Sequence, residues 1–390
     1  GYENAKPELM RANILRSLEI SRRLVAEQPE DVDAKRLLAS NLVEYDFFCE
    51  KEPAAKLKLN QERVLLWEQL VKAQPNDGDT CDQLANAYNT LNYLFNLYER
   101  PDEAARYRRL IIQAREREVH LLDKSQATNH ERDLLAGTYI VLGSTYAEEG
   151  EDLNTAEDYF ERALTVAENL VAEHPDYRLG WVRLSAANRE IAELQYRQGD
   201  YSGALNHFQA SLRAVTDASA KLTDISMRAA EPKYMLRVAE CLYRTTGHID
   251  EGLQLMRDAT ALNSQLGEFG STEAATATRN ALFFRSSGEV YAALGLKEKA
   301  LDSYRQAQDL WKKIAGLEPQ DQAAADGQIA RLHLLRGDLY AASRADRETA
   351  QHEYQAGVDI LSKLKAENHI VLDDLRQLYQ AQQKLRASAG

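Results

Sequence analysis

Apolar residues recur along this chain every three or four positions, a spacing that places them on one face of an α-helix. The pattern is clearest over residues 134–171, where two such stripes follow one another. The turn residues at 149–152 separate the stripes, and Pro175 stops the second helix because proline cannot continue one. The segment therefore predicts a two-helix hairpin. Its first stripe runs through Leu135, Tyr139, Leu142, Gly143 and Tyr146, and its second through Ala156, Phe160, Ala163, Leu164 and Ala167.

A helix-ending phrase recurs at a regular spacing. It reads Val-Ala-Glu-Gln-Pro at 25–29, Val-Lys-Ala-Gln-Pro at 71–75 and Val-Ala-Glu-His-Pro at 171–175, with a looser Ala-Gly-Leu-Glu-Pro at 315–319. The first and third prolines are 146 residues apart, and the third and fourth 144. These distances fit three units of about 48 residues each, and two long helices per unit predict about sixteen helices in the chain.

No Pro-, Gly- or Ser-rich linker interrupts the repeat, so we expect one continuous helical array over residues 1–390. The segment 1–29 reads as the second half of a unit, and 368–390 as a closing helix. A chain that opens partway through a unit fits a fragment of a longer protein.

The formal charge of −13 disfavours nucleic acid and anionic membranes as ligands, because both are polyanions. No apolar run approaches the roughly 20 residues of a membrane-spanning helix, and no signal peptide is visible, so we expect a cytoplasmic protein. The most basic stretch is interleaved with apolar and acidic residues and predicts a solvated helix face. Its arginines are Arg106, Arg108, Arg109, Arg115 and Arg117.

Signatures of chemistry are missing from the sequence. The cysteines Cys49, Cys81 and Cys241 are odd in number and widely spaced, so we expect buried free thiols. The segment 77–82 resembles the start of a calcium loop. However, the loop's sixth position is not glycine and Tyr88 stands where the loop's closing glutamate would be, so we expect a helix cap. Scattered histidines and the lack of a phosphate-binding motif predict no metal, no cofactor and no enzymatic activity.

The hairpin over 134–171 resembles the tetratricopeptide repeat, whose signature is aromatic-x-x-Leu-Gly-x-x-Tyr, a glycine, and Ala-x-x-x-Phe-x-x-Ala. The resemblance covers nearly the whole chain. The units here are longer, however, at about 48 residues against about 34 in that family. It implies an all-α superhelical solenoid of antiparallel helix pairs. Units ending in Ala-x-x-Pro-x-Asp are also similar to tetratricopeptide-like segments behind serine/threonine kinase domains in some bacteria. Further copies are marked by Phe284, Gly288, Tyr291, Gly295, Ala300, Tyr304 and Ala307, by Gly337, Tyr340, Ala350 and Tyr354, and by Gly199, Ala204 and Phe208.

In this family the first helices of successive pairs line a concave groove that binds an extended peptide or a partner helix. The resemblance therefore implies a non-catalytic protein–protein interaction scaffold, part of a larger signalling protein. The groove-facing positions of the family fall on Asn86, Asn89, Tyr93, Asn96, Arg189, Glu193, Tyr196, Arg197, Arg237, Arg244, Arg285 and Glu289.

The arginines among these positions leave two interpretations open. A row of arginines favours an acidic peptide segment as the partner, because a guanidinium holds a carboxylate by two hydrogen bonds. Alternatively, the arginines pair with glutamates of their own or adjacent helices. Those glutamates are Glu190, Glu193, Glu240 and Glu289. For the whole chain, the alternative function is a regulatory sensor solenoid that binds a small effector or homodimerises.

Overall fold

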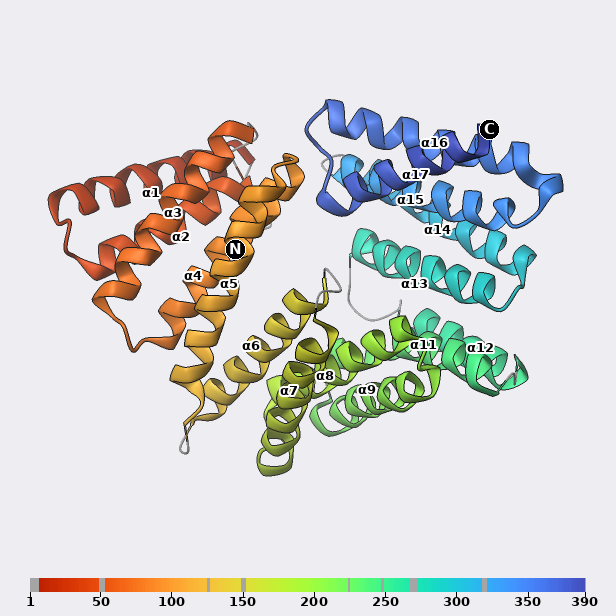
Figure 1. The fold of residues 1–390 in the computed structure, drawn as a ribbon, viewed down its shortest axis with the longest axis horizontal. Coiled ribbons are helices and arrows are strands. Elements are labelled where there is room, and N and C mark those ends of the chain that lie inside the picture. The colour runs from red at the N-terminus through yellow and green to blue at the C-terminus, as the bar shows by residue number, and fades with distance from the viewer. Residues whose placement is uncertain are drawn as a thin grey trace. The chain divides into compact units, whose positions relative to one another are not determined.

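The computed structural model describes residues 7–48, 53–124, 127–148, 152–223, 225–246, 249–266, 272–317 and 321–389. The secondary structure of these residues is entirely helical (Figure 1). They contain sixteen α-helices of 16 to 22 residues and a single-turn helix, α10, which confirms the predicted all-α fold and number of helices. The chain separates into two compact units, 1–145 and 146–390, which are described one at a time. The single array over 1–390 stays a prediction.

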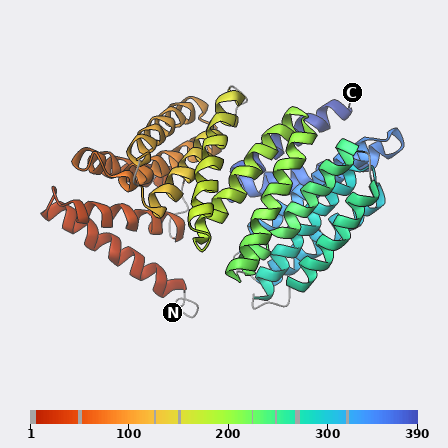
Figure 2. The same cartoon turned by 90° about the horizontal axis from the view of Figure 1, so that it is seen from below.

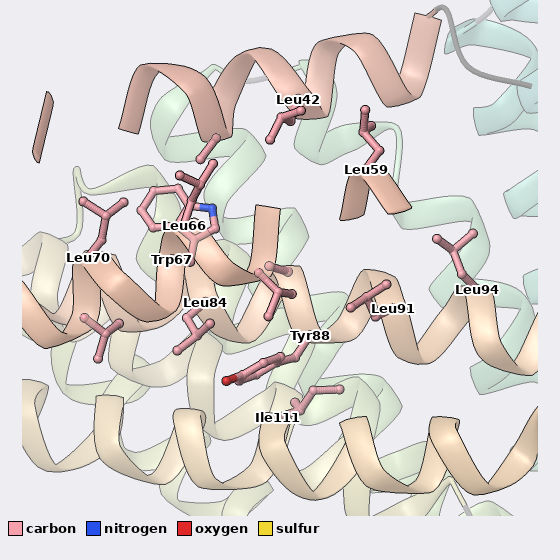
Figure 3. Packing of buried hydrophobic residues seen from close by; sticks show 14 of the residues in the cluster. Leu42, Leu59, Leu66, Trp67, Leu70, Leu84, Tyr88, Leu91, Leu94 and Ile111 are labelled. Carbon is pink, nitrogen blue, oxygen red and sulfur yellow. The ribbon is translucent and has the colours of Figure 1, made fainter. Parts of the chain in front are cut away.

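Unit 1 contains the first helices of the chain, and each packs against the next from α1 to α5. Their inward faces build one apolar core in which Leu42, Leu70 and Leu91 are fully buried. Figure 3 shows residues of four successive helices meeting there, with Ile111 as the contribution of α5. The helices are α1 (Pro7–Glu27), α2 (Val32–Phe48), α3 (Pro53–Ala73), α4 (Gly78–Leu97), α5 (Pro101–Leu122) and α6 (Asn129–Ala147), the last of which ends in unit 2.

The helices of unit 2 pack as antiparallel pairs, and those drawn from green to cyan lie side by side (Figure 2). The pairs relevant below are α8 with α9, α11 with α12, and α13 with α14. The helices are α7 (Leu153–Glu173), α8 (Arg178–Gln198), α9 (Tyr201–Leu222), α10 (Ile225–Arg228), α11 (Glu231–Thr246), α12 (Ile249–Leu266), α13 (Glu273–Ala293), α14 (Lys297–Leu317), α15 (Gln322–Ala341), the 3-10 turn η2 (Arg344–Asp346), α16 (Arg347–Ala366) and α17 (Leu372–Ala389).

The helix-ending phrases act as predicted. Helices α1, α3 and α7 each end two residues before the proline of their phrase. Proline lacks the backbone N–H that a helix needs and disfavours helical geometry in the residue before it. Helix α1 lies within the segment 1–29 and helix α17 within 368–390. Their roles as a half unit and a closing helix stay predictions.

Glycines of the repeat signature allow close helix packing in unit 2. A Cβ atom on Gly288 would lie 2.6 Å from Cδ1 of Tyr304, and one on Gly337 would lie 2.6 Å from Cδ1 of Tyr354. Ordinary contacts between carbon atoms are about 3.5–4.0 Å long, so no larger residue fits without moving the ring. The tetratricopeptide-like pattern thus reports a real packing requirement between the two helices of a pair.

The prediction that the arginines of α5 lie on a solvated face is wrong for Arg115. This side chain is only 5% exposed, and its Nη1 donates to Glu118 at 2.7 Å and to Asp82 at 2.5 Å, while Nη2 donates to Asn86 at 2.6 Å. Glu118 is fully buried and also accepts from Thr138 at 2.7 Å. Burial raises the pKa of Glu118 despite the positive charge beside it. A charged pair can face inward when each partner neutralises the other, which the sequence pattern does not reveal.

A second polar network joins α15 and α16. Glu353 accepts hydrogen bonds from His333 at 2.7 Å and from Arg336 at 3.1 Å. Burial alone would raise the pKa of Glu353, but the hydrogen bond from His333 and the charge of Arg336 outweigh it and lower that pKa. The ionised carboxylate is therefore part of the folded structure.

Of the remaining expectations from the sequence, some are confirmed and others only in part. Cys81 and Cys241 are buried free thiols, as predicted, and Cys49 lies outside the described residues. Asp77 occupies the N-cap position of α4, as predicted, but its side chain makes no capping hydrogen bond to the backbone; it accepts from the side chains of Arg36 and Thr80 instead. Within the described ranges there is no cluster of metal-ligating side chains and no helix apolar and long enough to cross a bilayer.

Candidate functional site

Unit 2 contains a groove on α11 and α13, the first helices of two successive pairs. It consists of two cavities, of about 510 Å³ and about 280 Å³. Both are lined by Lys233, Leu236, Arg285 and Ser286, so they adjoin. We call the two cavities together the α11–α13 groove. The larger volume lies within the range of about 300–1,000 Å³ that is typical of ligand pockets.

Helical spacing brings the lining residues together. On α11 they follow one another at intervals of one and three residues, and on α13 at intervals of one to three, so that each set covers one side of its helix. Helix α8 adds Glu193 to the smaller cavity. The set on α11 is Pro232, Lys233, Leu236, Arg237 and Glu240, and that on α13 includes Ala275, Thr278, Arg279, Leu282, Arg285, Ser286 and Glu289.

The larger cavity is mainly apolar. Leu236 and Phe283 form part of its wall and are otherwise buried in the core, whereas Leu282 is 38% exposed. An exposed leucine beside a cavity offers apolar surface to a partner at little cost in dehydration of polar groups. The charged residues of this wall are all basic, namely Lys233, Arg279 and Arg285.

The smaller cavity is charged. Arg237 lies between two glutamates: its Nε and Nη2 donate to Glu193 at 3.1 and 2.8 Å, and its Nη1 donates to Glu240 at 2.6 Å. Glu240 also accepts from Tyr196 and, at 3.2 Å, from Arg244. Burial raises the pKa of the Tyr196 hydroxyl, so it stays a hydrogen-bond donor. Arg237, Arg244, Glu193 and Glu240 thus form one network of ion pairs at this half of the groove.

The structure confirms the interpretation that the arginines pair with nearby glutamates. Arg189 pairs with the adjacent Glu190, and Arg237 and Arg244 pair within the network just described. The Nε of Arg285 lies 3.6 Å from Glu289. Exposed Arg197 donates to the backbone carbonyl of Glu193 at 3.3 Å. The predicted row of arginines is therefore mostly neutralised internally.

The four groove positions predicted in unit 1 lie on α4 and are considered apart from the α11–α13 groove. Asn86 accepts from the buried Arg115, and Asn96 donates to the carbonyl of Asn92 at 3.0 Å. Asn89 is exposed and Tyr93 is 39% exposed. Their binding role stays a prediction.

Several residues of the groove escaped the sequence analysis, among them Lys233, Arg279, Leu282 and Ser286. Lys233 precedes the predicted Arg237 by four residues, and Leu282 and Ser286 precede the predicted Arg285 and Glu289 by three. They share a helix face with the predicted positions, and this spacing was the available signal. Arg279, in turn, precedes Leu282 by three residues.

The chain is similar in fold to solved structures at low sequence identity. BtubC (BKLC) from P. vanneervenii matches with a TM-score of 0.50 and 18% identity, covering 69% of this chain and 95% of BtubC. Aspartyl phosphate phosphatase F from Bacillus subtilis matches with a TM-score of 0.45 and 14% identity, covering 96% and 94%. Human IFIT1, solved as a dimer with PPP-AAAA, matches with a TM-score of 0.39 and 13% identity, covering 92% and 74%.

The likeness to BtubC shows the fold alone, because the identity is below 25%. No protein-family model matches the sequence, and no curated protein matches it significantly. The antiparallel helix pairs, the glycine–tyrosine packing and the similarity in fold to BtubC together confirm the tetratricopeptide-like, all-α fold.

Proposed function

We propose that the chain is a non-catalytic interaction scaffold whose unit 2 binds an extended peptide segment or a partner helix in the α11–α13 groove. The observation that carries this proposal is the groove itself, with an apolar cavity continuous with a charged one along two first helices. A cavity that extends along the helices suits an elongated segment better than a compact effector.

Several groove residues support binding rather than catalysis. The central arginine of the smaller cavity, Arg237, is paired with Glu193 and Glu240. A general acid or base needs a proton-transfer partner in a substrate, and a nucleophile needs an adjacent base. The groove offers apolar surface and fixed charges, which are the elements of recognition. A cytoplasmic location, self-association and a place in a larger signalling protein remain predictions.

A selection experiment tests the proposal. A display library of random short peptides is panned on the full chain, and bound sequences are measured individually by fluorescence anisotropy. Ser286 lines both cavities, so Ser286→Trp places a large ring where they adjoin. The control is Gln306→Trp, at an exposed position on the second helix α14.

Ser286→Trp should abolish binding of the selected peptides, whereas Gln306→Trp should leave it unchanged. Far-UV circular dichroism and thermal unfolding establish that both variants are folded. Equal binding by Ser286→Trp and the unaltered chain, or failure of the library to yield any peptide that distinguishes them, would overturn the proposal.

A further inference from the structure

The charge of the larger cavity is unbalanced. Its wall carries three basic side chains, Lys233, Arg279 and Arg285, and its described lining residues include no acidic one. The smaller cavity, in contrast, places three basic residues beside three glutamates. The excess positive charge of the α11–α13 groove is thus concentrated at its apolar end.

Guanidinium groups at this end have unused hydrogen-bond donors. The Nε and Nη2 of Arg279 and the Nε of Arg285 are buried, yet none of them has a hydrogen-bond partner among the described residues. Arg285 does place its Nη1 on Gln328 at 2.7 Å, but its Nε is 3.6 Å from Glu289, beyond hydrogen-bond length. Buried N–H groups without partners are rare in folded proteins because their dehydration is uncompensated.

Electrostatics point the same way. Burial, together with the nearby charge of Arg331, lowers the pKa of Arg285, and Glu289 only partly offsets this. The surroundings therefore disfavour the positive charge of Arg285. A ligand carboxylate would supply both the missing negative charge and acceptors that match a guanidinium in geometry.

We propose that the α11–α13 groove selects a peptide segment that carries a carboxylate side chain next to a bulky apolar one. The carboxylate is held by Arg279 and Arg285. The apolar side chain lies against Leu282 and Phe283 in the larger cavity, whose volume of about 510 Å³ accommodates it. This inference rests on the proposed function and adds the chemistry of the segment that is bound.

The test uses peptides selected on the full chain as described above. Each is resynthesised with its acidic residues changed singly to Gln or Asn, and each version is titrated into the unaltered chain, Arg279→Gln and Arg285→Gln. The matched control is Arg305→Gln, which removes an arginine that is 67% exposed on α14.

Selected peptides should share an acidic residue beside a bulky apolar one. Neutralising that residue should weaken binding to the unaltered chain about tenfold or more, the range of a charge-assisted hydrogen-bonded pair. The same change should have little further effect in Arg279→Gln, because the two groups act as a pair. Arg305→Gln should behave like the unaltered chain.

The outcomes separate the two proposals. Peptides that are blocked by Ser286→Trp but bind equally well after neutralisation would overturn the carboxylate inference and leave the peptide groove intact. Peptides that ignore Ser286→Trp would overturn both. Equal losses in Arg279→Gln and Arg305→Gln would also overturn the inference, since they would indicate a general effect of net charge.

Discussion

The glycine at position 288 allows a stringent test of the packing between α13 and α14. Gly288→Ala adds a Cβ atom 2.6 Å from Cδ1 of Tyr304, and Tyr304 is only 1% exposed. The ring or a helix must move by about 1 Å to restore ordinary contact. Overpacking of this kind costs about 1–3 kcal/mol, whereas alanine returns up to about 1 kcal/mol through its higher helix propensity. We therefore expect a net loss of about 1–2 kcal/mol.

Gly316 provides the matched control. It lies within α14, and a Cβ atom there would meet nothing within 4 Å beyond its chain neighbours and the adjacent turns of its own helix backbone. Gly316→Ala should therefore stabilise unit 2, by up to about 1 kcal/mol, through helix propensity alone. The same substitution thus has opposite signs at two helical positions.

The assay is urea unfolding followed by far-UV circular dichroism. The free energies of unfolding are compared between variants whose unfolding free energy has the same dependence on urea concentration. A double-mutant cycle with Tyr304→Leu isolates the clash, because removing the ring should erase most of the penalty of Gly288→Ala. A Gly288→Ala variant as stable as the unaltered chain, or purely additive effects of the two substitutions, would refute the reasoning.

Three further predictions follow from the buried polar groups. Arg115→Ala should destabilise unit 1 by about 3–5 kcal/mol, because it leaves the buried Glu118 without its counter-charge, whereas Arg109→Ala on the exposed face should be nearly neutral in urea unfolding. Burial raises the pKa of Cys241 to about 12, so a thiol reagent should modify this residue only after unfolding, as read by peptide mapping. Because the pKa of Glu353 is lowered in the folded protein, its ionised form should stabilise the fold above the usual carboxyl pKa, and this contribution should be lost as the pH falls. Glu353→Gln should therefore flatten the loss of stability between about pH 5 and pH 2, as measured by unfolding at a series of pH values.

Each of these has a result that would contradict it. Equal stability of the two arginine variants would mean that α5 has no buried charged pair. Rapid labelling of Cys241 in the native protein would mean that its helix opens readily. An unchanged acid decline in Glu353→Gln would place the loss of stability on other carboxylates.

The sequence by itself determined the fold class and the helices. A periodic apolar stripe, prolines two residues beyond three helix ends, and glycines facing tyrosines are local features that constrain φ, ψ and side-chain size. Their effects extend over one helix or one helix pair, so they can be read without knowing the rest of the molecule. The same is true of α1 and α17 at the two ends of the chain.

Only the tertiary structure decided how the charged residues are used. Arg115 looks like a surface residue in the sequence and is buried against Glu118, while Arg237 looks available to a ligand and is held between Glu193 and Glu240. Arg279, which the sequence did not single out, lines a cavity with unpaired donors. Some electrostatic partners come from different helices, as with Arg237 on α11 and Glu193 on α8, which are 44 residues apart in the sequence. Helical periodicity specifies which side of a helix a residue occupies, but the packing of different helices decides what faces it.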